Sequence, residues 1–261
     1  MSNLKMTMLL IAVVLTSALS AQENPTLYLI GDSTMSDKKN PESNPEHGWG
    51  QVLPELLTET IKVSNHAVNG RSSKSFITEG RWEAVLKTLK AGDFVFIQFG
   101  HNDQKYKDST RYTNPFTQYR YNLERYVKET REAGATPILM SSIVRRKFNE
   151  HGTLEDTHGN YPLVVRMVAR DLEVPFIDMQ YLTERLERKF GPEKSKSIHL
   201  HFEPGENEYY KNGKHDDTHL SYSGAKLIAS LALQEIARQD LALENYIKPE
   251  VLKADIVTLK D

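Results

Sequence analysis

Short apolar runs alternate along the chain with longer stretches in which apolar residues recur every three or four positions. Short apolar runs predict buried strands, and the three-to-four spacing predicts amphipathic helices. The predicted strands are residues 26–30, 61–65, 93–99, 136–143 and 174–177. The predicted helices are residues 50–57, 81–89, 116–133, 162–172, 182–190 and a last helix that begins after Leu220, with Ser221, and runs to about Ala237. This alternation predicts an α/β fold in which crossover helices connect parallel strands.

Two polar stretches that contain glycine and proline, residues 36–48 and 197–217, predict long loops. Long loops in compact domains are often part of a binding site. No repeat, low-complexity tract or linker divides the sequence after the first residues. We therefore expect one domain over residues 22–261.

The first 21 residues have the features of a secretory signal peptide. Lys5 precedes an uncharged run over residues 6–18, and small residues follow at positions 17–21. The run is shorter than the roughly 20 apolar residues of a membrane-spanning helix. We expect cleavage after Ser20 or Ala21, and a mature protein without a membrane span that is periplasmic or secreted.

Composition excludes several classes of function. The 33 basic and 35 acidic residues nearly balance, so there is no electrostatic footprint for nucleic acid or an anionic membrane. Short basic groups such as residues 145–147 are interpreted as solvated surface. Because the chain has no cysteine, a disulfide framework, a thiolate metal site and a thiol nucleophile are all excluded.

Polar residues follow three of the predicted strands. The first strand runs into GDST at residues 31–34, the second into NGRSS at residues 69–73, and the third into GHND at residues 100–103. Ligands in open α/β sheets bind at the carboxyl ends of the strands. We therefore expect the three turns to converge at one edge, although each is also an ordinary turn sequence.

A serine hydroxyl becomes a nucleophile when a base takes its proton and an acid orients that base. Ser33 is the candidate nucleophile, and His219 in the segment HDDTHLS is the candidate base. Asp216, three residues before His219, can reach the far ring nitrogen from the same loop. Asp217 can also take this role, and the spacing does not decide between the two aspartates.

Acyl transfer also needs donors where negative charge develops on the carbonyl oxygen, and loss of one donor costs about 3–4 kcal/mol. The backbone N–H groups of Ser33 and Gly70 and the side-chain amide of Asn102 are the candidates. Taken singly, Gly70 and Asn102 are also typical of tight turns. Together with the Asp-x-x-His segment they form a pattern that unrelated turns rarely produce.

The four blocks GDST, NGRSSKSF, GHND and DDTH resemble the SGNH (GDSL-type) hydrolase superfamily. The segments NGRSSKSFITEGRW, FGHND and FEPGENEYYKNGKHDDTHLSYSGA are similar to its rhamnogalacturonan acetylesterase branch, and the resemblance covers Tyr28 to about Ala237. It implies a three-layer α/β/α, flavodoxin-like parallel sheet and a cofactor-free serine esterase. The implied substrate is an acetylated plant cell-wall polysaccharide or oligosaccharide of the pectic type. GDST in place of GDSL is usual for this branch.

Aromatic and basic residues in or beside these blocks are candidate sugar contacts. They are Arg71, Trp49, Tyr209 and Tyr210, and also Trp82 and Phe202, although packing is the stronger interpretation of Trp82. His199 and His201 form a His-x-His with His215 nearby, but neither the spacing nor a carboxylate is distinctive of zinc, so we expect no metal.

Other functions stay open at this stage. An acetylxylan esterase, a broad-specificity short-chain carbohydrate esterase and a lipase would all use the same catalytic residues. A non-catalytic carbohydrate-binding protein on the same fold is a further alternative. The α/β-hydrolase nucleophile elbow Gly-x-Ser-x-Gly does not fit, because Met35 stands at its last position.

Overall fold

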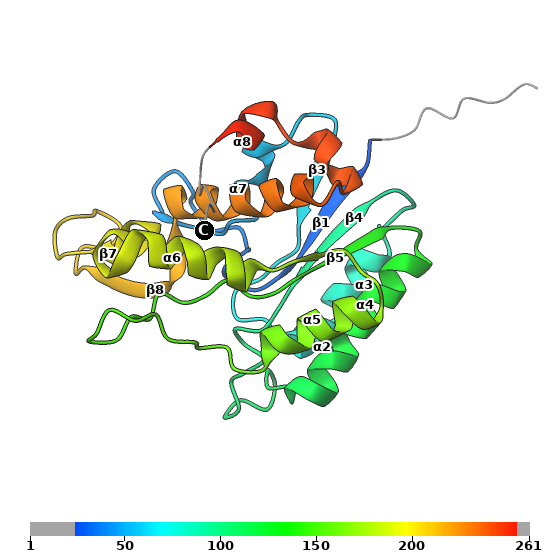
Figure 1. Ribbon diagram of the computed structural model, residues 1–261, viewed down its shortest axis with the longest axis horizontal. Coiled ribbons are helices and arrows are strands. Elements are labelled where there is room, and N and C mark those ends of the chain that lie inside the picture. Colours follow the sequence, from blue (N-terminus) through cyan, green and yellow to red (C-terminus); the bar gives the residue numbers. More distant parts are fainter. Residues whose placement is uncertain (1–23, 255–261) are drawn as a thin grey trace, which may run out of the picture.

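The computed structural model describes residues 24–254, which contain a five-stranded parallel sheet with the order β3-β1-β4-β5-β6 (Figure 1). Each strand lies within or close to a predicted strand. Their bounds are β1 (Thr26–Gly31), β3 (Lys62–Asn65), β4 (Phe94–Gln98), β5 (Thr136–Met140) and β6 (Phe176–Ile177). All four neighbouring pairs are parallel, so the predicted α/β fold with a parallel sheet is confirmed.

Helices cover both faces of this sheet and make a three-layer arrangement (Figure 1). Side chains alternate along β1, so that Leu27 and Leu29 pack into one apolar cluster and Tyr28 and Ile30 into the other. The first cluster contains residues of α1 (Leu53–Leu56), α6 (Met179–Lys194), α7 (Tyr222–Arg238) and α8 (Pro249–Lys253). The second contains residues of α2 (Ser73–Thr78), α3 (Arg81–Leu86), α4 (Arg120–Glu132) and α5 (Tyr161–Asp171). Strands covered on both faces are apolar at successive positions, as in FVFI of β4.

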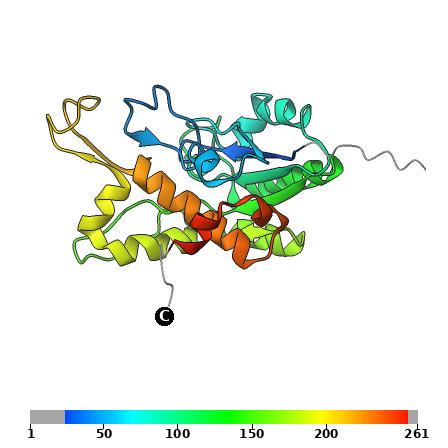
Figure 2. The ribbon, with the colours of Figure 1, turned by 90° about the horizontal axis from the view of Figure 1, so that it is seen from above.

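A second, antiparallel sheet stands beside the first, with the order β2-β8-β7. It consists of β2 (Glu46–His47), β8 (Lys214–Ser221) and β7 (His199–Phe202). In Figure 2 the hairpin of β7 and β8 projects from the body of the molecule next to the segment that contains β2. Both predicted loops therefore contain strands, and His219 lies on a strand rather than in a loop. The sequence hid these strands because histidine and charged residues occupy most of their positions.

Several helix boundaries also differ from the expectation. Helix α2 was not predicted because its segment is polar, but Ser72 and Ser75 form a capping box at its start. Helix α6 begins earlier than expected because the Asp178 carboxylate caps it. The predicted helix over residues 116–133 starts with a π-helical turn, η1 (Pro115–Tyr119). Two short 3-10 helices, η2 (Ser195–Ile198) and η3 (Ala242–Tyr246), complete the described chain.

The segment expected to be a signal peptide, residues 1–21, lies outside the described residues. Between residues 24 and 254 none of the helices has both the length and the apolar character that crossing a bilayer requires.

Candidate active site

Ser33, His219 and Asp216 form one chain of hydrogen bonds. Ser33 Oγ lies 3.0 Å from His219 Nε2, and His219 Nδ1 lies 2.9 Å from Asp216 Oδ2. Ser33 lies two residues after the end of β1 of the parallel sheet, whereas His219 and Asp216 both lie on β8 of the antiparallel sheet. A hydroxyl, an imidazole and a carboxylate in this order can generate a serine nucleophile.

The structure decides which aspartate faces His219. Asp216 Oδ1 accepts the backbone N–H groups of Thr218 and His219, both at 2.9 Å, while its Oδ2 contacts the His219 ring. The next side chain along β8, Asp217, points elsewhere: its Oδ1 accepts from Arg146 Nη1 at 2.6 Å and lies 2.8 Å from His201 Nε2. Asp216 therefore orients the imidazole, and Asp217 belongs to a separate ion pair.

The hydrogen bonds to Asp216 keep it ionised. Burial raises the pKa of Asp216, but the hydrogen bonds from the His219 ring and backbone, the charge of His219 and the Thr218 N–H together hold it well below its usual range. An ionised carboxylate at Nδ1 keeps a proton on that nitrogen. Nε2 is then free to accept a proton from the Ser33 hydroxyl.

Two further predicted residues, Gly70 and Asn102, line the same pocket as Ser33. Gly70 has φ +78°, a left-handed conformation that favours glycine. Space is not the reason for a glycine here, because an added Cβ would meet only Arg111 Nη1 at 3.7 Å. Asn102 is buried, and its Nδ2 donates to the Arg71 carbonyl at 3.1 Å. This bond fixes the amide group and leaves its second hydrogen for a ligand. The two turns thus bring Gly70 and the Asn102 amide to the pocket that contains Ser33.

One expected sugar contact is wrong. The side chain of Trp49 is completely buried, and its Nε1 donates to Gln98 Oε1 at 3.0 Å. Trp49 packs against Phe96 of the central strand, so it is a core residue that no substrate reaches. Trp82 is buried as well, and its indole donates to Glu129, in agreement with a packing role.

The other expected sugar contacts lie near the surface and stay predictions. The Arg71 guanidinium donates to the Glu79 carboxylate at 3.0 Å and to the Asn69 carbonyl at 2.9 Å. Tyr209 is 44% exposed, and Tyr210 stacks on Phe202 with ring centroids 5.9 Å apart. Both tyrosines lie on the tip that connects β7 and β8.

The histidines of the suggested His-x-His have protein partners. His199 Nε2 lies 2.8 Å from the buried Glu187 Oε1, and His201 pairs with Asp217 as described above. His215 Nε2 lies 3.7 Å from Glu203 Oε1. No group of three or more metal-ligating side chains suited to an ion occurs within the described part of the chain.

Sequence reasoning missed three basic residues around the pocket. Lys105 and Arg145 line it, and Lys38 is buried below the Ser33 turn. The run of residues 145–147 was interpreted as solvated surface, but Arg146 is buried and only Lys147 extends into solvent, paired with Glu155. Lys38 and Lys105 follow the GDST and GHND blocks by a few residues, and only this closeness in sequence could have indicated that they lie near the pocket. The sequence gives no such indication for Arg145, because the strand that it follows, β5, is not followed by a recognised block.

A sequence model of the GDSL-like Lipase/Acylhydrolase family matches residues 29–227, and the chain belongs to this family. The match extends from β1 into α7 and includes all residues of the hydrogen-bonded chain. The protein is therefore an ester hydrolase, and its parallel sheet with flanking helices is the SGNH hydrolase fold.

Individual relatives are similar over most of their length. Rhamnogalacturonan acetylesterase RhgT of Bacillus subtilis is 40% identical over 85% of this chain and 93% of its own. Probable rhamnogalacturonan acetylesterase YesY of the same organism is 34% identical over 85% and 97%. The crystal structure of the B. subtilis protein YxiM superposes with a TM-score of 0.70 at 28% identity, covering 84% of this chain and 58% of that one. An acetylxylan esterase from Geobacillus stearothermophilus shares the fold, with a TM-score of 0.59 at 20% identity over 82% and 94% of the chains.

Proposed function

We propose that the protein is a serine esterase that removes O-acetyl groups from pectic polysaccharide, with rhamnogalacturonan as its substrate. The observation that carries the proposal is the 3.0 Å contact between Ser33 Oγ and His219 Nε2. The similarity to RhgT and YesY supports the acetyl group and the pectic backbone.

In the first half of the reaction, Ser33 Oγ attacks the acetyl carbonyl carbon while His219 Nε2 takes the hydroxyl proton. The oxyanion accepts hydrogen bonds from the N–H groups of Ser33 and Gly70 and from Asn102 Nδ2. The bond from the carbonyl carbon to the sugar oxygen then breaks, and His219 returns the proton to that oxygen. The products are a free sugar hydroxyl and an acetylated Ser33.

In the second half, His219 takes a proton from a water molecule, whose oxygen attacks the acetyl-enzyme. Collapse of this intermediate releases acetate and returns the proton to Ser33 Oγ. Asp216 keeps the imidazole oriented and stabilises its positive charge in both halves. No residue changes oxidation state, and the chemistry needs no cofactor.

The test is acetate release from acetylated rhamnogalacturonan, acetylated xylan and acetylated homogalacturonan, compared between the wild type, Ser33→Ala and Ser43→Ala. Ser43 is the control because it is an exposed serine of the same loop. We expect the highest rate on rhamnogalacturonan, a loss of about a thousandfold or more in Ser33→Ala, and no change in Ser43→Ala.

Other outcomes separate the alternatives. A higher rate on xylan would keep the mechanism and reject the pectic substrate. A preference for octanoyl over acetyl esters would favour a lipase, but the pocket argues against it, since charged and amide side chains line it. Binding of the polysaccharide without acetate release from the wild type would favour a non-catalytic carbohydrate-binding protein.

The same proposal includes export of the protein to the periplasm or the medium. The charged first residues and the apolar run over residues 6–18 support it. Amino-terminal sequencing of the protein from cell fractions tests it: a mature chain that starts at Ala21 or Gln22 is expected, and a cytoplasmic chain that retains Lys5 would contradict it.

A further inference from the structure

Two cations in the catalytic pocket form no salt bridge with the described residues. Lys105 and Arg145 both line the pocket that contains Ser33 and Asn102. The Arg145 guanidinium donates only to neutral oxygens, Thr157 Oγ1 at 3.2 Å and the Thr157 and His101 carbonyls at 3.4 Å. Neither cation forms a salt bridge with a carboxylate of residues 24–254.

The other charges around the pocket are neutralised in pairs. Glu46 lies 2.9 Å from Lys38, and Lys214 lies 3.2 Å from Asp216. Arg111, close to Gly70, is paired with Asp108 at 2.6 Å. Lys105 and Arg145 are therefore the cations of this pocket that no carboxylate contacts directly within residues 24–254, although the charge of the buried Asp32 acts on both.

These two cations also lie close enough to repel each other. Burial, together with the charges of Arg111 and Arg145, lowers the pKa of Lys105, although the charges of Asp32 and Asp108 act in the opposite direction. Burial lowers the pKa of Arg145, and here too the charge of Asp32 acts in the opposite direction. An anion that binds between two such cations stabilises their charged forms.

We infer that Lys105 and Arg145 form a carboxylate subsite beside Ser33, which selects acetylated sugar chains that carry a uronate next to the ester. Arg145 supplies a planar fork of N–H donors that matches a carboxylate, and Lys105 supplies a mobile ammonium at the exposed rim. This inference rests on the proposed function, because it concerns the same pocket and the same reaction.

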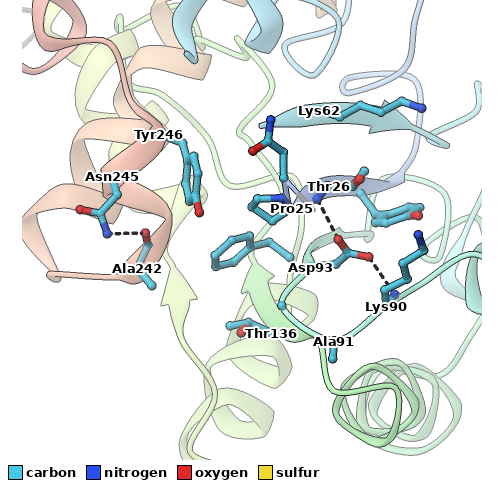
Figure 3. Close-up of a pocket in the computed structure, with 14 residues that line it drawn as sticks. Pro25, Thr26, Lys62, Lys90, Ala91, Asp93, Thr136, Ala242, Asn245 and Tyr246 are labelled. Atoms are coloured by element: carbon cyan, nitrogen blue, oxygen red, sulfur yellow. Dashed lines mark hydrogen bonds between the residues drawn. The ribbon is translucent and has the colours of Figure 1, made fainter. Parts of the chain in front are cut away.

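The pocket at the amino ends of the parallel strands has a different character (Figure 3). Its carboxylate, Asp93, accepts the backbone N–H groups of Thr26 and Lys90, both at 2.8 Å, and thereby connects two chain segments. Neither a candidate nucleophile with a base nor an unpaired pair of cations lies among the residues drawn. Of these two pockets, the one at the carboxyl ends of the strands is therefore the one that suits an anion.

The inference is tested with acetylated galacturonate oligosaccharides, their methyl esters and p-nitrophenyl acetate. The variants are Lys105→Gln and Arg145→Gln, and the control is Lys107→Gln, an exposed neighbour whose ammonium lies over the Tyr106 ring. We expect kcat/KM on the free-carboxylate substrate to fall about tenfold in each variant. The rates on the methyl esters and on p-nitrophenyl acetate should stay within about twofold, and Lys107→Gln should match the wild type.

Each outcome is decisive. An equal loss on charged and neutral substrates, or no loss on either, overturns the subsite. If the wild type prefers neither the acid nor its methyl ester but Ser33→Ala is inactive, the subsite is wrong while the proposed function stands. If no carbohydrate ester releases acetate, both are wrong. Lys105→Gln keeps the test valid if Arg145→Gln fails to fold, because Lys105 lies at the surface.

Calorimetry with inactive Ser33→Ala protein gives a second readout. Galacturonate should bind more tightly than galactose, and Lys105→Gln in this background should remove the difference. Equal binding of the two sugars to Ser33→Ala would overturn the subsite.

Discussion

The Lys38 ammonium donates a hydrogen bond of 2.6 Å to the backbone carbonyl of Ser33. It also donates to Asn69 Oδ1 at 2.8 Å, one residue before Gly70, and forms a salt bridge of 2.9 Å with Glu46. Lys38 is only 7% exposed, and Ser36 Oγ at 3.2 Å is a further acceptor for its ammonium, so polar partners offset the cost of burying it. One buried ammonium thus connects the turn that contains Ser33 to the turn that contains Gly70.

Replacing Lys38 tests whether this connection positions the oxyanion donors. In Lys38→Met we expect kcat on p-nitrophenyl acetate to fall roughly 10- to 100-fold with little change in KM, since displaced donors weaken only the transition state. The exposed neighbour serves as the control, and Lys39→Met should be unaffected. A purely structural role would lower the melting temperature and leave kcat of the folded protein within twofold.

Substitution of the two adjacent aspartates of β8 is expected to have different effects: one should lower activity, and the other should lower stability. Asp216→Asn should lower kcat about 10⁴-fold, because the amide favours the wrong imidazole tautomer. Asp217→Asn should leave kcat within about threefold and lower the free energy of unfolding by about 1 kcal/mol, because Arg146 loses a half-exposed partner. Steady-state kinetics and urea unfolding of both variants measure this, and the reverse pattern would reassign the orienting residue.

A buried histidine pair predicts a loss of stability in acid. His158 Nε2 lies 3.3 Å from His101 Nδ1, and burial, with a smaller effect of the Arg145 charge, lowers the pKa of His158 to about 3. As the pH falls below about 6.5, His158 is therefore protonated in the unfolded chain but stays neutral in the folded protein. The stability that comes from the neutral His158 is fully present above about pH 6.5 and is lost progressively as the pH falls toward 3.

Urea unfolding between pH 4.5 and 7.5 measures this effect. The free energy of unfolding of the wild type should fall more steeply toward low pH than that of His158→Gln. His101, whose pKa burial also lowers, still contributes in the variant, so its slope should decrease and not vanish. Parallel slopes for the two proteins would contradict the buried neutral state of His158.

Trp49 gives a test in which stability changes and substrate affinity does not. Trp49→Phe removes the indole donor from Gln98 and leaves a small cavity in the core, which should cost about 1–3 kcal/mol. KM on rhamnogalacturonan should stay within about twofold. A severalfold rise in KM with unchanged stability would restore Trp49 as a sugar contact.

Residues that follow from a local pattern could be predicted from the sequence. Ser33 and Asn102 follow the buried apolar strands β1 and β4, and Gly70 follows the more polar strand β3; the strand order of an α/β fold brings such ends together. His219 was identifiable because Asp216 stands within reach on the same segment. These positions needed no knowledge of how distant side chains pack.

Residues whose place depends on packing could not be predicted. Regular strand alternation would place Asp217 on the face of His219. Asp216 faces His219 because the register shifts between β7 and β8, where His199 pairs with Leu220 and Leu200 with Asp216, and the segment was interpreted as a loop. Trp49 was interpreted as a sugar contact because its contact with Phe96 forms only when the chain folds. Arg145 lies in a basic run, and a sequence does not show which of three neighbouring cations turns inward.

Residues 203–213, the tip between β7 and β8, can vary without disturbing the chemistry. At the base of the hairpin, the buried Leu220 pairs with His47 on one side and His199 on the other. Beyond a register shift, Asp216 pairs with Leu200, so both ends of the segment from Asp216 to Leu220 are held in place. Insertions and deletions at the tip leave this ladder intact. Evolution can therefore change which polysaccharide such an enzyme binds by lengthening or shortening this one loop, while the catalytic reaction stays the same.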